Sequence, residues 1–130
     1  MIIKFLLTFS VFMVIDLVWL GILARPIYVH YLGDFLRPTP HWPMAFLFYA
    51  LFVCGLIMFA IEPALAAKDV KQAFIKGAYF GFFTYMTYEL TNFSVMKDWP
   101  IGIVPIDIAW GVCLSSLVCG ISSFLYMKFF

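Results

Sequence analysis

Four carboxylates lie inside stretches of the sequence that are otherwise apolar: Asp16, Glu62, Glu89 and Asp107. An ionised side chain at the centre of a lipid-facing helix costs from about 2.5 to more than 10 kcal/mol, so carboxylates within a membrane normally face the protein interior and serve a function. Glu62 lies near the end of its stretch, where it can reach water or Lys68. The other three are candidates for binding a proton, a metal ion or an organic cation.

Two of these carboxylates belong to the same short motif. The sequence reads Asp16-Leu-Val-Trp19 near the N-terminus and Asp107-Ile-Ala-Trp110 near the C-terminus. On a helix this spacing places the carboxylate and the indole about one turn apart on neighbouring faces. The tryptophans have an equally good interpretation as packing or membrane-interface residues. The aspartates have no comparably simple structural explanation.

A polar stripe runs along the third apolar stretch at steps of three and four residues, as on one face of a helix. Its members are Gly77, Gly81, Tyr85, Tyr88, Glu89 and Asn92. The two glycines allow a neighbouring backbone to approach closely. Gly111, Ser115 and Ser122 form the matching smooth face beside Asp107. The stripe therefore predicts a packing seam that opens into a polar pocket.

The composition indicates a membrane protein. Of 130 residues, 65% are hydrophobic and 12% are charged, against about 25% charged in soluble domains. Four apolar stretches approach the roughly 20 residues that a helix needs to span the hydrocarbon. We predict one all-α domain covering residues 1–130, an integral membrane four-helix transmembrane bundle. The predicted spans are residues 3–23, 43–66, 74–96 and 105–126.

The connection between the first two spans has a distinct composition. Residues 24–36 mix basic, acidic and large apolar side chains, and residues 37–43 read Arg-Pro-Thr-Pro-His-Trp-Pro. We predict a short helix in the membrane interface followed by an extended, proline-rich connector. Trp42 and Trp99 stand at helix edges, where indole rings favour the interface.

Basic residues predict the orientation. The basic residues near the two termini and the middle loop are Lys4, Lys68, Lys71, Lys76 and Lys128, against Arg25, Arg37 and Lys97 on the other side. The positive-inside rule then places both termini in the cytoplasm. In this topology Asp16 and Glu89 lie late in outward-running helices, and Asp107 lies early in an inward-running helix. We therefore expect all three in one pocket in the outer half of the bundle.

Taken in order, several motifs resemble those of a known family. They are Asp16-x-x-Trp19-Leu, Tyr88-Glu89-x-x-Asn92, Trp99-Pro100 and Asp107-x-x-Trp110-Gly111. The chain resembles an uncharacterised bacterial family of small membrane proteins with four predicted helices, known only as a domain of unknown function. The resemblance implies a bacterial inner-membrane location and four spans. It implies no catalytic role for any residue.

Three functions remain open. The first is a small transporter or binding protein whose pocket takes a cationic or proton-linked ligand. We predict that its ligand-binding residues are Asp16, Trp19, Tyr85, Tyr88, Glu89, Asn92, Asp107 and Trp110. Aromatic faces attract cations, and three carboxylates crowded in a medium of low dielectric cannot all ionise, so at least one should hold a proton.

The second function is an intramembrane enzyme acting on a lipid or isoprenoid, with an Asp or Glu as general acid or base and with His30 or His41 from the outer loop. No recognisable catalytic signature supports it. The third is a structural or accessory subunit in which polar side chains hold helices together. Membrane lipids are expected partners and a homodimer is plausible from the small size. A net charge of +1 gives no basic surface for nucleic acid, and no motif predicts a cofactor or a metal.

Overall fold

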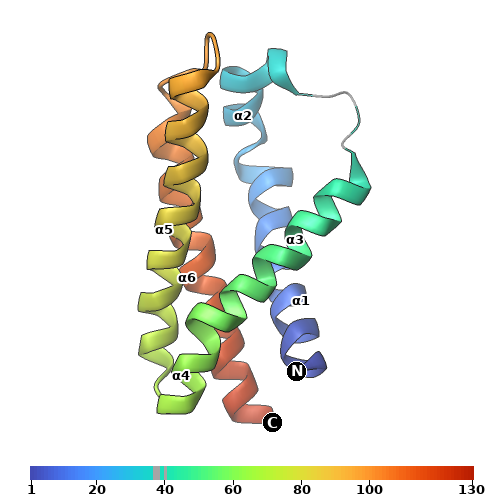
Figure 1. Cartoon of the computed structure of the whole chain (residues 1–130). Helices are drawn as coiled ribbons and strands as arrows, with labels where there is room; N and C mark the ends of the chain where they lie inside the picture. The colour runs from blue at the N-terminus through green and yellow to red at the C-terminus, as the bar shows by residue number, and fades with distance from the viewer. Residues whose placement is uncertain (37–38, 40) are drawn as a thin grey trace.

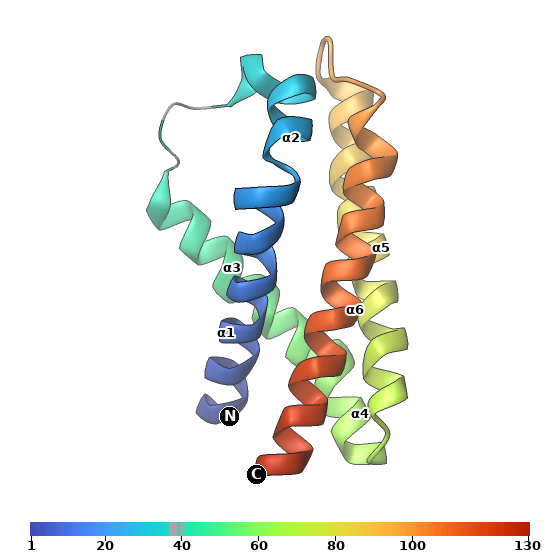
Figure 2. The same ribbon diagram turned by 180° about the vertical axis from the view of Figure 1, so that it is seen from behind.

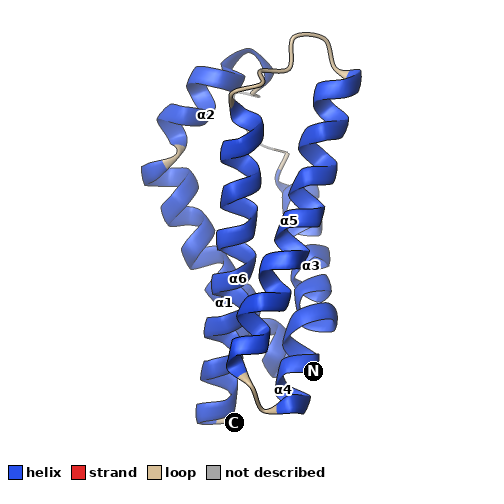
Figure 3. Ribbon diagram, turned by 90° about the vertical axis from the view of Figure 1, so that its left-hand side faces the viewer, coloured by secondary structure: helices blue, strands red, loops and turns tan. Residues whose placement is uncertain are grey.

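In the described part of the chain, the protein is built from helices and connecting loops without strands (Figure 3). A computed structural model describes residues 1–36, 39 and 41–130. The elements in chain order are α1 (Ile2–Val18), the π-helical η1 (Trp19–Leu23), α2 (Arg25–Leu32), the 3₁₀-helical η2 (Gly33–Phe35), α3 (Trp42–Leu56), the π-helical η3 (Ile57–Ile61), α4 (Glu62–Ala67), α5 (Val70–Val95) and α6 (Ile103–Phe129). The predicted all-α class is confirmed.

Three helical stretches among the described residues are long and apolar enough to cross a membrane. They are Ile2–Leu23, Trp42–Ala67 and Ile103–Phe129, and they match three predicted spans to within a few residues. The fourth predicted span corresponds to α5, which has 26 residues. This helix has the length of a span, but it carries Lys71, Lys76 and Glu89 along with several Tyr and Thr side chains.

The long helices alternate in direction (Figure 1). Both termini lie at one end of the molecule, together with the turn between α4 and α5. The opposite end holds α2 and the loop between α5 and α6; we call it the α2 end. The continuous helix formed by α3, η3 and α4 crosses the others obliquely, so that its first half diverges from α5 toward the α2 end.

Each of the two π-helical turns is followed within three residues by a proline. Pro26 follows η1 and Pro63 follows η3. A proline cannot donate its backbone nitrogen, and its ring clashes with the carbonyl four residues earlier. The wider turn takes up this mismatch, as when the Ala24 nitrogen donates to the Trp19 carbonyl at 2.7 Å. The helix thereby changes direction at Trp19, three residues after Asp16.

The antiparallel α5 and α6 pack closely because glycines line their contact (Figure 2). A Cβ atom at Gly77 would lie 2.6 Å from the Ser115 carbonyl oxygen, and one at Gly81 would overlap the Gly111 carbonyl group. Ser115 and Ser122 are fully buried on the same face of α6. The predicted seam is therefore present, with Gly77 and Gly81 facing the smooth surface of α6.

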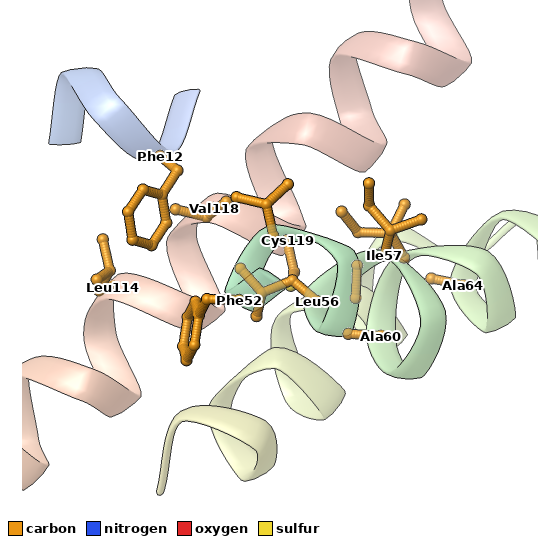
Figure 4. Close-up of a cluster of buried hydrophobic side chains, with 12 residues drawn as sticks. Phe12, Phe52, Leu56, Ile57, Ala60, Ala64, Leu114, Val118 and Cys119 are labelled. Carbon is orange, nitrogen blue, oxygen red and sulfur yellow. The ribbon is translucent and has the colours of Figure 1, made fainter. Parts of the chain in front are cut away.

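The main apolar core lies where η3 and the end of α3 cross α6 and α1 (Figure 4). Phe12 of α1, Leu56 of α3 and Val118 of α6 are all at most 1% exposed. Phe52 stands at the edge of this cluster nearest the α2 end. The core thus fills the middle of the molecule, leaving the space toward the α2 end to be lined by other residues.

A second, smaller core fixes α2 against the loop between α5 and α6. Trp99, Ile103 and Val104 are buried there against Tyr28 and Tyr31 of α2. A short helix, α2, thus follows the first apolar stretch, and its place in the membrane interface stays a prediction. Trp99 is only 8% exposed, so it packs inside the protein, and the interface position expected of it stays a prediction.

Glu62 lies far along the chain from Lys4 but pairs with it. The Lys4 ammonium lies 2.7 Å from the Glu62 carboxylate at the start of α4. We expected Glu62 to reach water or Lys68, and the structure gives it a different basic partner. This ion pair joins α1 to α4 near the end that holds the termini, away from the other three carboxylates.

The glycine seam gives a direct test of the packing. We expect Gly81→Ala to destabilise the protein by about 1–3 kcal/mol, because the new methyl group meets a backbone carbonyl that cannot rotate away. Gly21→Ala is the matched control, since a Cβ there meets nothing within 4 Å. Thermal unfolding in one detergent measures both. Equal melting temperatures for the two variants would contradict close contact at Gly81.

Candidate functional site

A cavity of about 620 Å³ lies between the helices near the α2 end. Five helices contribute to its wall. The lining residues are Asp16 and Leu20 from α1 and η1; Tyr28 and Leu32 from α2; Phe48, Tyr49 and Phe52 from α3; Thr84, Tyr85, Tyr88 and Glu89 from α5; and Asp107 and Trp110 from α6. Its volume lies within the range typical of small-molecule sites.

Three carboxylates from three different helices line this cavity. Asp16 and Asp107 are each 6% exposed, and Glu89 is 1% exposed. Among the described residues that line the cavity, none is Lys, Arg or His. Arg25 is exposed on α2, while Arg37 falls outside the described residues. The carboxylates therefore meet with no basic side chain in the cavity wall.

Neutral donors hold two of the three carboxylates. The Tyr28 hydroxyl donates to Asp107 Oδ1 at 2.6 Å, and the Trp99 indole nitrogen donates to Glu89 Oε2 at 2.9 Å. Burial and the nearby Asp107 carboxylate raise the pKa of Tyr28 above its usual range, so its hydroxyl remains a donor. The first bond joins α2 to α6, and the second joins the loop after α5 to α5. Both donors, Tyr28 and Trp99, belong to the small core at α2. Glu89 and Asp107 also lie close to one another.

The two Asp-x-x-Trp motifs meet in the structure. Trp19 and Trp110 stack face to face, with ring centroids 4.2 Å apart and planes inclined by 11°. Because α1 and α6 run in opposite directions (Figure 2), the two motifs are antiparallel to each other where the rings stack. Trp110 lines the cavity and Trp19 supports it from behind. The stack agrees with the interpretation of the two tryptophans as packing residues, while their place in the membrane interface stays a prediction.

Asp16 has a different environment from the other two acids. The Trp110 indole and the Tyr49 hydroxyl lie near its carboxylate. Tyr49 in turn stands among Phe12, Phe46 and Phe48 on α1 and α3. Asp16 therefore lies beside aromatic side chains of α3 and α6.

The predicted site residues fall into two groups. The structure gathers Asp16, Tyr85, Tyr88, Glu89, Asp107 and Trp110 around one cavity. Trp19 and Asn92 do not line it; Trp19 stacks on Trp110, which does. Asn92 lies next to Tyr88 on the following turn of α5, and Tyr88 is itself 55% exposed. Whether any of these residues binds a ligand stays a prediction.

The two histidines do not reach the cavity. His30 is exposed on α2 beside Tyr31. His41 is exposed at the start of α3, where its Nδ1 accepts a bond from the Met44 backbone nitrogen at 3.4 Å. The acid–base role expected of them in an enzyme would require access to the acidic site, which this structure does not give them.

Several residues that contact the three acids were not predicted from the sequence. Tyr28, Tyr49 and Trp99 supply polar contacts to the three acids. No motif in the sequence around Tyr28 or Tyr49 marks either of them as a partner of a carboxylate. For Trp99 there was a usable signal, because it follows Glu89 by ten residues across a tight turn. For Tyr49 there was none, since its position depends on the oblique path of α3.

The acids line one cavity without forming a metal cage. Within the described residues, no group of three or more His, Cys, Asp and Glu side chains is arranged to hold a metal ion. The cysteines Cys54, Cys113 and Cys119 are all free thiols. What the arrangement offers chemically is negative charge beside aromatic faces in a water-poor space.

These features define an all-α membrane protein with buried acidic side chains. The chain belongs to the family described as "Predicted membrane protein (DUF2177)", whose model matches residues 1–124. The family is one of unknown function. No curated protein and no solved structure matches the chain.

Proposed function

We propose that this protein binds a small organic cation in the cavity near the α2 end, in competition with protons. One observation carries the proposal: three buried carboxylates converge on a space lined by aromatic rings and by no described basic residue. Such a site has negative charge in excess, and a bound cation or proton would compensate it. Movement of the ligand across the membrane would extend this binding role.

The aromatic lining favours an organic cation as the ligand. A desolvated cation over an aromatic face gains about 2 kcal/mol or more. The rings nearest Asp16 are those of Tyr49 and Trp110, and Tyr85 also faces the cavity. We assign the main contact with the positive charge to Asp16. Glu89, which already accepts a hydrogen bond from Trp99 and lies close to Asp107, would hold the exchangeable proton.

A structural role is the second candidate, because the same hydrogen bonds join helices. Tyr28 links α2 to α6, and Trp99 links the loop after α5 back to α5. Side-chain hydrogen bonds of this kind between membrane helices contribute about 0.6 kcal/mol on average. In that case amide substitutions would keep most of the bonding, and no cation would stabilise the protein.

Ligand binding is tested by thermal stability in the presence of benzyltrimethylammonium. A ligand that binds only the folded state at about 100 times its Kd adds roughly 2.7 kcal/mol of stability, which raises the melting temperature by several degrees. We expect this shift in the wild type, a smaller one at lower pH because protons compete, and none in Asp16→Asn. Asp34→Asn, an exposed acid outside the cavity, is the control. No shift in the wild type would favour the structural role.

We propose further that the chain crosses a bacterial inner membrane four times, with both termini in the cytoplasm. The three apolar stretches supply three spans. α5 would be the fourth, since it lies along α6 over much of its length (Figure 3), so a membrane around α6 would also surround α5. The basic residues at the end with the termini exceed those at the α2 end, as expected of a cytoplasmic side. α2 would then lie in the outer interface.

Labelling of introduced cysteines tests this topology. In a background without the native thiols, cysteines at Asp34 and Asp98 should react with an impermeant maleimide applied outside the cell. A cysteine at Asp69, in the turn before α5, should react only after the membrane is opened. The reverse pattern would invert the orientation, and labelling of Asp69 and Asp98 from the same side would remove the fourth span.

A further inference from the structure

The cavity reaches the outer surface of the protein between α3 and α5. Phe48 of α3 and Tyr88 of α5 both line it, yet they are 48% and 55% exposed. The first half of α3 diverges from α5 at this level (Figure 1). These two residues therefore frame a side opening into the cavity.

The surface around the opening is apolar. Leu47 and Leu51 on α3 and Phe83 on α5 are all more than half exposed. Because α3 belongs to a stretch that is apolar and long enough to cross a membrane, the opening faces the hydrocarbon of the bilayer and not water.

Two other sides of the cavity are covered by described residues. At the α2 end, Tyr28 and Leu32 of α2 form part of the wall. α2 is held there by the Tyr28–Asp107 hydrogen bond and by packing of Tyr31 against Gly102, where a side chain would collide with the ring. On the opposite side, Phe52 and the main core close the space. Among the described residues, the gap between α3 and α5 is framed by the two most exposed lining residues, ahead of Leu20 of η1 at 38%.

We infer that the ligand is an amphiphile dissolved in the bilayer, with a cationic head and a single hydrocarbon chain, which enters between α3 and α5. This inference rests on the proposed cation site. The head would lie beside Asp16 and the aromatic rings, and the chain would pass between Phe48 and Tyr88 to the lipid. The acidic interior complements the head, and the apolar rim matches the chain.

Photo-crosslinking of the whole protein in lipid nanodiscs tests the inference. The probe is a dodecyltrimethylammonium ion with a diazirine at the end of its chain. We expect labelled peptides from the facing surfaces of α3 and α5 around Phe48 and Tyr88, with loss of this labelling when excess benzyltrimethylammonium is added. Asp16→Asn should lose it as well, and Asp34→Asn should keep it.

The outcomes separate the two proposals. Binding of benzyltrimethylammonium that depends on Asp16, without labelling of α3 and α5 by the long-chain probe, would overturn the side entry and leave the cation site standing. Labelling that persists in Asp16→Asn would reflect contact with bulk lipid and would also overturn the side entry. Failure of both compounds to bind would overturn the cation site itself.

Discussion

The cost of placing carboxylates in a medium of low dielectric governs the arrangement of this protein. Each acid in an apolar helix must face inward and find a partner. Glu62 meets Lys4 in an ion pair. Asp107 and Glu89 meet neutral donors, which come from α2 and from the loop after α5. The position of α2 across the end of the molecule is thus coupled to the acid that it covers.

The stacked tryptophans and the glycine seam bring α1, α5 and α6, the three helices that carry the acids, together around the cavity. The seam between α5 and α6 sets Glu89 and Asp107 close to each other, because glycine removes the side chains that would separate the helices. The Trp19–Trp110 stack joins α1 to α6, and Asp16 lies beside Trp110. The oblique α3 then leaves room for a cavity where a parallel helix would have filled it.

The helical periodicity and the composition of the sequence were enough to predict the all-α fold, the three stretches that are long and apolar enough to cross a membrane, and the buried face of α5. Gly77, Gly81 and Glu89 could be placed together because a spacing of four residues fixes a common face. The neutral partners Tyr28 and Trp99 could not, because their contacts depend on how α2 and the loop after α5 fold back over the acids. A polar stripe on a helix predicts which residues share a face, but not how far along the helix a cavity extends. Asn92 shares the face of Glu89 and does not line the cavity.

The central claim is that the cavity holds uncompensated acid groups, and infrared spectroscopy of the carboxylic C=O stretch measures it most directly. With no described basic residue in the cavity wall, at least one of Asp16, Glu89 and Asp107 should be protonated near neutral pH. The account predicts a protonated carboxyl band that changes in Asp16→Asn, Glu89→Gln or Asp107→Asn and is unaffected by Glu62→Gln, whose acid is paired with Lys4. A spectrum with no such band near neutral pH would contradict the account and would require a basic partner for the three acids.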